Sequence, residues 1–96
     1  MDILQKQNGS KGSFYVQVKD EILAEMTYSM SGESLMIIDH TEVSDELRGK
    51  NVGYLLVKKA VDYARAHQIK IFPLCPFAKS VFDKKGNEFS DVLRAG

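Results

Sequence analysis

Hydrophobic and polar residues alternate through the first part of the chain, as in strands that bury one face. The alternation is clearest at Phe14–Val18 and continues over Ile22–Met30, with polar turns after each segment. A short strand over Ile3–Gln7 precedes the turn-rich segment 8–13. These segments predict antiparallel strands.

The segment Leu35–Ile38 is apolar at every position, which favours a central strand covered on both faces. We expect this strand to continue to Val43. From residue 52 the hydrophobic period becomes helical, and the helix is expected to end near 67–68. Its predicted buried stripe consists of Val52, Leu55, Leu56, Ala60, Tyr63 and Ala64.

Two short elements follow the long helix. Ile69–Phe72 is a short strand that Pro73 ends, and Pro76 begins a second helix that runs to about Gly86. The strand–helix–strand unit predicts a right-handed crossover between parallel strands. The expected fold class is therefore α/β, an α+β mixed sheet with one long helix on a face and a short second helix.

Composition limits the function classes. The 96 residues, 44% of them hydrophobic, predict one soluble domain over 1–96. Thirteen basic residues balance thirteen acidic ones, so we expect no nucleic-acid partner. No segment approaches the roughly 18 apolar residues of a membrane span, and the N-terminus lacks the apolar core of a signal peptide. We expect no membrane partner, no metal, a cytoplasmic location, and a monomer or weak dimer.

The segment Thr41–Gly53 leads from the central strand into the long helix and predicts an anion site. The first N–H groups of a helix lack intrahelical partners, and the helix dipole adds positive charge there. Gly49 and Gly53 allow close approach of the backbone, Asn51 tolerates left-handed angles, and the neighbouring Arg48 and Lys50 supply charge-assisted hydrogen bonds. An ordinary glycine-containing loop with two solvated basic residues is the alternative.

The segment 43–53 resembles the cofactor signature of the GNAT superfamily of N-acetyltransferases, Arg/Gln-x-x-Gly-x-Gly/Ala. Arg48 and Gly53 match the signature, whereas Asn51 stands where its first glycine is expected. The segment 75–86 is similar to the family's pantetheine-lining helix, and the small stand-alone members are the most similar in pattern. The resemblance implies acetyl-CoA as cofactor, with its acyl-pantetheine arm lying between two splayed strands.

Several features depart from the family pattern. Phe82 stands where the family usually has a tyrosine general acid, so no hydroxyl is present there. The two helices that the family places after its first strand are absent, with only the turn 8–13 in their place. The C-terminal strand pair is also cut short, which leaves 87–96. What remains resembles a cofactor-binding half of the family fold.

Three residues are candidate catalysts. Cys75, the only cysteine, is the expected N-cap of the second helix, where the dipole favours a thiolate. It is a candidate nucleophile or leaving-group acid, or instead a small apolar residue that touches pantetheine. His40 and Glu42 lie two apart on the central strand and share a face unless a bulge intervenes, so either is a candidate base. Ordinary strand-end polarity is the alternative.

Two hypotheses follow for the function. The first is an acetyl-CoA-dependent N-acetyltransferase acting on an unknown amine, small or protein-borne. The second is a non-enzymatic acyl-CoA sensor or partner-binding module that has lost its acceptor site. Lys84 and Lys85 are either contacts of the nucleotide phosphates or a solvated helix end. The predicted cofactor-binding residues are Thr41, Val43, Arg48, Gly49, Lys50, Asn51, Val52, Gly53, Cys75, Pro76, Phe77 and Phe82.

Overall fold

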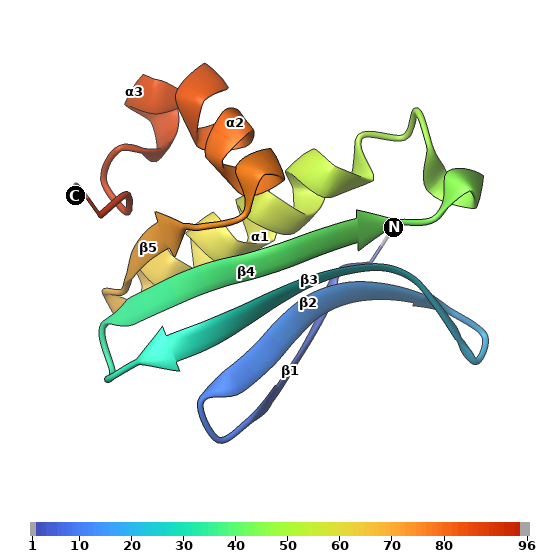
Figure 1. Ribbon diagram of the computed structural model, residues 1–96, viewed down its shortest axis with the longest axis horizontal. Helices are drawn as coiled ribbons and strands as arrows, with labels where there is room; N and C mark the ends of the chain where they lie inside the picture. The colour runs from blue at the N-terminus through green and yellow to red at the C-terminus, as the bar shows by residue number, and fades with distance from the viewer. Residues whose placement is uncertain (1, 95–96) are drawn as a thin grey trace.

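The computed structural model describes residues 2–94; Met1, Ala95 and Gly96 of the predicted domain lie outside this range. The strands are β1 (Leu4–Asn8), β2 (Lys11–Val18), β3 (Glu21–Ser31), β4 (Leu35–Val43) and β5 (Lys70–Pro73). The helices are the short 3-10 helix η1 (Asp45–Leu47), α1 (Val52–His67), α2 (Pro76–Lys84) and α3 (Gly86–Phe89). Figure 1 shows α1, α2 and α3 above the antiparallel strands.

The strands form one five-stranded sheet in the order β1-β2-β3-β4-β5. Neighbouring strands from β1 to β4 pair antiparallel, and β4 pairs parallel with β5 across α1. This arrangement confirms the predicted mixed sheet, including the short first strand. None of the helices in residues 2–94 combines the length and the apolar character that a membrane crossing requires.

A β-bulge in β4 decides which side chains face α1. Thr27 of β3 pairs with His40, but the next residue, Tyr28, pairs with Ile38, so Asp39 is the extra residue. Before the bulge, Met36 and Ile38 face the core. After it, the phase reverses, because Thr41 lies opposite the buried Met26. His40 and the residues in phase with it therefore lie on the sheet face away from α1.

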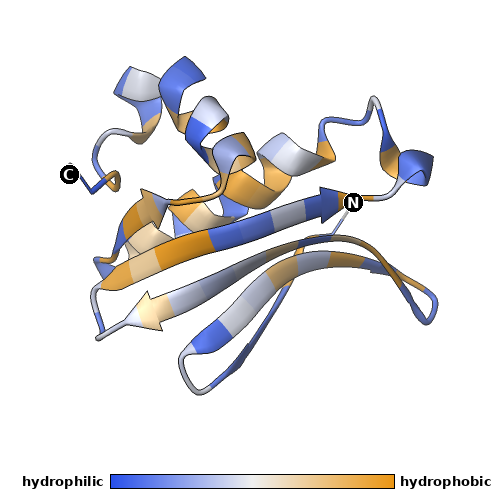
Figure 2. Ribbon diagram, in the orientation of Figure 1, coloured by the Kyte–Doolittle hydropathy of each residue, from blue (hydrophilic) through white to orange (hydrophobic). Residues whose placement is uncertain are grey.

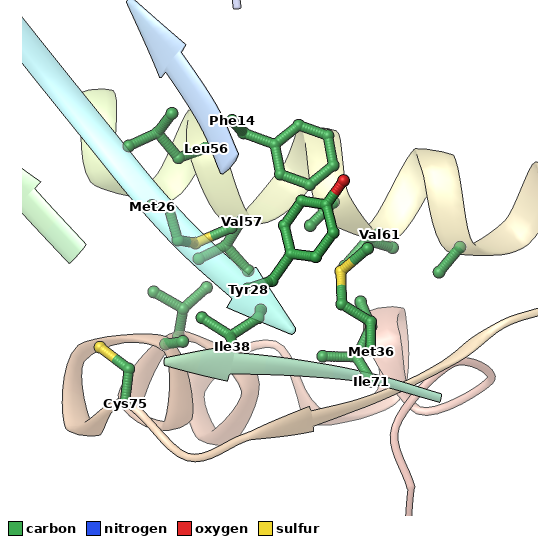
Figure 3. Packing of buried hydrophobic residues seen from close by; sticks show 14 of the residues in the cluster. Phe14, Met26, Tyr28, Met36, Ile38, Leu56, Val57, Val61, Ile71 and Cys75 are labelled. Carbon is green, nitrogen blue, oxygen red and sulfur yellow. The ribbon is translucent and has the colours of Figure 1, made fainter. Parts of the chain in front are cut away.

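The core lies between α1 and one face of the sheet. Its fully buried side chains include Phe14, Met26, Tyr28, Met36, Ile38, Leu56, Val57, Val61 and Ile71 (Figure 3). Hydropathy changes along β4: the strand is hydrophobic in its first half, and it is hydrophilic through most of its second half (Figure 2). The opposite face carries polar pairs such as Lys6 with Glu25, at 3.4 Å between Nζ and Oε2. One sheet face thus builds the core, and the other combines polar pairs with the half-buried Leu35 and Ile37 of β4.

The buried stripe of α1 differs from the predicted one. Val57 and Val61 are fully buried, whereas the predicted Leu55 and Tyr63 are only half-buried. The apolar side chains of α1 cover more than one stripe, so periodicity alone does not select the two valines. Val57 and Val61 are covered by side chains of the sheet (Figure 3). The helical period of α1 carries no information about the position of the sheet.

The segment after α2 folds back onto β5. Phe89 and Val92 are buried, and Leu93 forms a single parallel bridge with Ile71. Arg65 of α1 donates two hydrogen bonds to the carboxylate of Asp91, at 2.8 and 2.9 Å, and this guanidinium lowers the pKa of Asp91. The segment 87–94, for which the sequence predicted only a shortened end, therefore completes the core.

Gly12 should be intolerant of a side chain. A Cβ there would lie 2.5 Å from the ring of Tyr28 and 2.7 Å from the carbonyl oxygen of Lys6. The Tyr28 hydroxyl is held by hydrogen bonds with Gln5 and Gln7, so the ring is not free to move. We expect Gly12→Ala to lower the free energy of unfolding by about 1–3 kcal/mol, measured by urea denaturation.

Gly86→Ala is the matched control. Apart from its chain neighbours and its own helix backbone, no heavy atom of residues 2–94 lies within 4 Å of the position of its Cβ, and its backbone is not left-handed. This variant should be neutral or more stable by about 0.4–1 kcal/mol. Equal effects of the two substitutions would contradict the packing of Tyr28 over β2.

Candidate functional site

The loop between β4 and α1 has a defined shape. The Ser44 side chain accepts a hydrogen bond from the N–H of Glu46 at 3.3 Å, and the buried Leu47 anchors η1 to the core. Gly49 and Asn51 then adopt left-handed backbones, with φ of 82° and 61°. Asn51 thus adopts the left-handed backbone that its residue type was expected to tolerate.

The N-terminus of α1 is open. Asn51 occupies the N-cap position, but its backbone is left-handed and its side chain makes no capping hydrogen bond. The first-turn N–H groups, which include those of Val52 and Gly53, lack helical partners by geometry. Donors of this kind attract anions, because they carry the positive end of the helix dipole.

These donors border a cavity of about 610 Å³, which we call the donor cavity. Its volume is that of a small-molecule site. It lies between β4, the loop after β4, the start of α1 and one side of α2. Its lining residues are Thr41, Val43, Leu47, Arg48, Gly49, Asn51, Val52, Gly53, Tyr54, Phe77, Ser80, Val81, Lys84 and Lys85.

The lining is positively charged. Arg48, Lys84 and Lys85 are basic, and no aspartate or glutamate is among the lining residues. Arg48 donates a hydrogen bond to Asp45 at 2.5 Å, with both side chains more than four-fifths exposed. Exposed pairs of this kind contribute little to stability, so Arg48 can exchange Asp45 for a ligand phosphate at small cost.

Gly53 is in contact with α2. A Cβ on Gly53 would lie 2.4 Å from Cζ of Phe77, so the ring fills the space that a side chain would occupy. From the sequence we expected this glycine to admit a phosphate. In the structure, its missing side chain lets the Phe77 ring form a wall of the donor cavity.

Within residues 2–94, no strand pairs with the second half of β4 on the side of β5, which leaves a free edge there. β5 pairs with β4 only over Leu35–Ile38, and the last link is the N–H of Cys75 donating to the carbonyl of Ile38 at 3.0 Å. The N–H of Ser44 points to β3, where it bonds Leu23. Because N–H groups alternate along a strand, those of Val43 and Thr41 point toward the gap between β4 and β5.

Cys75 lies where this gap begins. It is the N-cap residue of α2 with Pro76 in the first turn, as predicted, and its side chain is 5% exposed. Its Sγ lies 3.5 Å from Oγ1 of Thr41, which lines the donor cavity. Burial raises the pKa of the thiol, but its hydrogen bond with the Thr41 hydroxyl and those with the backbone of Ala78 and Phe77 outweigh this effect. The net pKa is lowered.

His40 and Glu42 form a pair on the other face of β4. The imidazole Nε2 lies 3.0 Å from Oε1 of Glu42, and their side chains are 64% and 79% exposed. The bulge precedes both residues, so they share a face as the spacing predicted. They flank Thr41 in sequence, but their side chains point away from the donor cavity.

The other predicted site residues divide into two groups. Thr41, Val43, Arg48, Gly49, Asn51, Val52, Gly53 and Phe77 line the donor cavity together. Lys50, Cys75, Pro76 and Phe82 do not belong to the lining. Phe82 is 2% exposed and packs edge-on against Phe89 in the core, at 5.7 Å between ring centroids. Its proposed contact with a cofactor stays a prediction.

Sequence reasoning named Phe77 as a cofactor residue, and Lys84 and Lys85 as either phosphate contacts or a solvated helix end, but it missed Ser80 and Val81 on the same side of the cavity. Phe77, Ser80, Val81 and Lys84 lie at helical positions i, i+3, i+4 and i+7, so α2 presents them as one stripe. This spacing was readable in the sequence once α2 was placed beside the loop. Leu47 and Tyr54 carry no comparable signal.

The comparisons with known proteins identify the class of protein. A family model described as GCN5-related N-acetyl-transferase matches residues 13–92. The solution structure of a GCN5-like putative N-acetyltransferase from Staphylococcus aureus is 37% identical in sequence, with a TM-score of 0.71, and the match covers 99% of this chain and 89% of that one. The chain belongs to the GCN5-related N-acetyltransferase family, which confirms the resemblance seen in the sequence.

More distant structures share the fold alone. The ribosomal-protein-alanine N-acetyltransferase from Brucella melitensis biovar Abortus 2308 is 14% identical, with a TM-score of 0.66 over 93% of this chain and 65% of that one. The IAA acetyltransferase from Bacillus cereus ATCC 14579 is 15% identical, with a TM-score of 0.57 over 78% and 53% of the two chains. No curated protein matches the sequence at a significant level.

The Thr41 hydroxyl should control the acidity of Cys75. Thr41→Val keeps the shape of the side chain but removes the hydrogen bond that favours the thiolate. We expect the pKa of Cys75 to rise, which moves the onset of its reaction with iodoacetamide to higher pH. Thr27→Val, on the opposite face, is the control. An unchanged alkylation profile in Thr41→Val would contradict the contact.

Gly53→Ala should displace the Phe77 ring, because the new methyl group overlaps its Cζ. We expect a loss of stability of about 1–3 kcal/mol in urea denaturation. Adding Phe77→Leu should recover part of this loss, since the shorter side chain leaves room for the methyl group. If the double variant is as unstable as the sum of the two single variants, the contact does not have the described geometry.

Proposed function

We propose that this protein is an acetyltransferase that binds acetyl-CoA in the donor cavity and transfers the acetyl group to an amine. The observation that carries the proposal is the uncapped N-terminus of α1, which opens onto a cavity with three basic and no acidic lining residues. In a chain of zero net charge, this local excess of cations supports the assignment of an anion site. The diphosphate of CoA has the charge and size that such a cradle accepts.

The free edge of β4 is suited to the pantetheine arm. Amide groups in that arm can pair with the backbone of Thr41 and Val43, as an added strand would. Phe77 and Val81 provide an apolar wall on the side of α2. An acyl group on such an arm would approach Thr41 and Cys75, where β4 and β5 separate.

The residues around Thr41 provide for both proton transfers. The attacking amine forms a bond to the thioester carbonyl carbon, the carbon–sulfur bond breaks, and CoA leaves as a thiolate. The amine proton passes through water to His40, because the imidazole lies on the other face of β4 and points away from the donor cavity, and Glu42 orients the imidazole through their hydrogen bond. Phe82 has no proton to donate, so the leaving sulfur takes one from Cys75.

A covalent route uses the same cysteine differently. Its lowered pKa favours a thiolate, which would attack the thioester to give an S-acetyl cysteine and free CoA. The amine would then attack this second thioester and regenerate the thiol. Mass spectrometry after mixing with acetyl-CoA alone separates the routes, since only the covalent one adds an acetyl group to Cys75.

Removing the thiol should abolish turnover but preserve cofactor binding. We expect Cys75→Ala to lower kcat for thiol release by about 100-fold or more, because it lacks the acid or the nucleophile. His40→Gln should lower kcat/KM, whereas His67→Gln, at the far end of α1, should leave it unchanged. The assay follows CoA release with a panel of small amines and lysine peptides.

Full activity of Cys75→Ala would contradict both roles of the thiol. If acetyl-CoA binds tightly but no amine releases CoA from the unmodified protein, the chain is instead a non-enzymatic acyl-CoA sensor or binding module. The buried Phe82, which offers no general acid, is the observation that favours this second candidate. The proposed location is the cytoplasm. Cys75 is the only cysteine of the sequence and its thiol is free, as is usual for proteins of a reducing compartment.

A further inference from the structure

The far end of the donor cavity carries two lysines that the proposed acetyl transfer does not use. Helix α2 begins beside β4, where Cys75 bonds Ile38, and its nine residues extend about 13 Å. Its first turn borders the cavity with Phe77, and its end borders it with Lys84 and Lys85. This end of α2 is hydrophilic and lies away from the sheet (Figures 1 and 2).

The ammonium group of Lys85 is positioned by the cavity wall. Its Nζ lies 5.2 Å from the ring centroid of Tyr54, in cation–π contact. The Tyr54 ring in turn stacks on the buried Phe89, with centroids 6.3 Å apart and planes 16° apart. Glu88 is a weak partner of Lys85 at 3.9 Å, across an exposed pair. The lysine is therefore held beside the cavity and keeps its charge available to a ligand.

The number of cations exceeds what a diphosphate needs. Arg48, with one positive charge, and the open N-terminus of α1, with about half a charge, offset most of the two charges of a diphosphate diester. Lys84 and Lys85 add two further charges in the same cavity. A phosphate monoester carries about −1.5 to −2 charges at pH 7, which is the complement of this pair.

We propose that Lys84 and Lys85 bind the 3′-phosphate on the ribose of CoA. The inference rests on the proposed function, because it places the diphosphate at α1 and the arm along β4, which directs the nucleotide toward the end of α2. The protein then selects free acyl-CoA as the donor. Dephospho-CoA thioesters and acyl groups carried on a protein-bound phosphopantetheine lack this phosphate, so they bind weakly.

Calorimetric titrations with acetyl-CoA and with acetyl-dephospho-CoA test the proposal. We expect the unmodified protein to bind acetyl-CoA about tenfold to a hundredfold more tightly, the usual effect of hydrogen bonds to a charged group. In the double variant Lys84→Gln with Lys85→Gln, the two affinities should become nearly equal. Its affinity for the dephospho ligand should match that of the unmodified protein.

Two controls separate charge from structure. Lys84→Arg with Lys85→Arg keeps both charges and should keep the preference. Lys79→Gln, on the same helix but paired with Asp83 and outside the cavity lining, should keep it too. Equal affinities of the unmodified protein for both ligands would overturn the 3′-phosphate site and leave the proposed function standing. Failure to bind either ligand would overturn both.

Discussion

The site depends on the point at which β4 and β5 stop pairing. The Cys75 N–H that donates to the Ile38 carbonyl is the last link between them, and β4 continues beyond it to Val43. A longer β5 would fill the edge of β4, and a shorter β4 would leave the loop before α1 without support. The separation also places Cys75 against Thr41, so the same constraint creates the gap and the acidic thiol beside it.

The open helix end has an energetic cost. An asparagine at the N-cap normally accepts a hydrogen bond from the first turn, and such a cap contributes about 0.5–2 kcal/mol. Here the left-handed backbone of Asn51 directs its side chain elsewhere, and the first-turn donors of α1 remain uncapped. The proposed function accounts for this loss, since a capped helix would compete with a phosphate for the same donors. The phenylalanine wall over Gly53 borders those donors on one side.

Local chemistry determined what the sequence could predict. Alternation of apolar residues located β2 and β3, and residue type alone indicated that Asn51 tolerates a left-handed backbone and that Cys75 takes an N-cap position. The bulge at Asp39 has no sequence signal, although it directs His40 away from the core. Tertiary contacts escaped prediction in the same way, because Phe77 meets Gly53 only after the chain has folded. Helix α3 has four residues, which is too short for any periodicity.

The central claim is that the first-turn amides of α1 hold a diphosphate. Amide chemical shifts recorded during a titration with acetyl-CoA test it directly, because they report each N–H separately. The account predicts that the largest shifts occur at Val52, Gly53 and Tyr54, with smaller ones at Thr41 and Val43 along β4. If these amides stay unmoved at millimolar acetyl-CoA while the protein remains folded, the account is wrong.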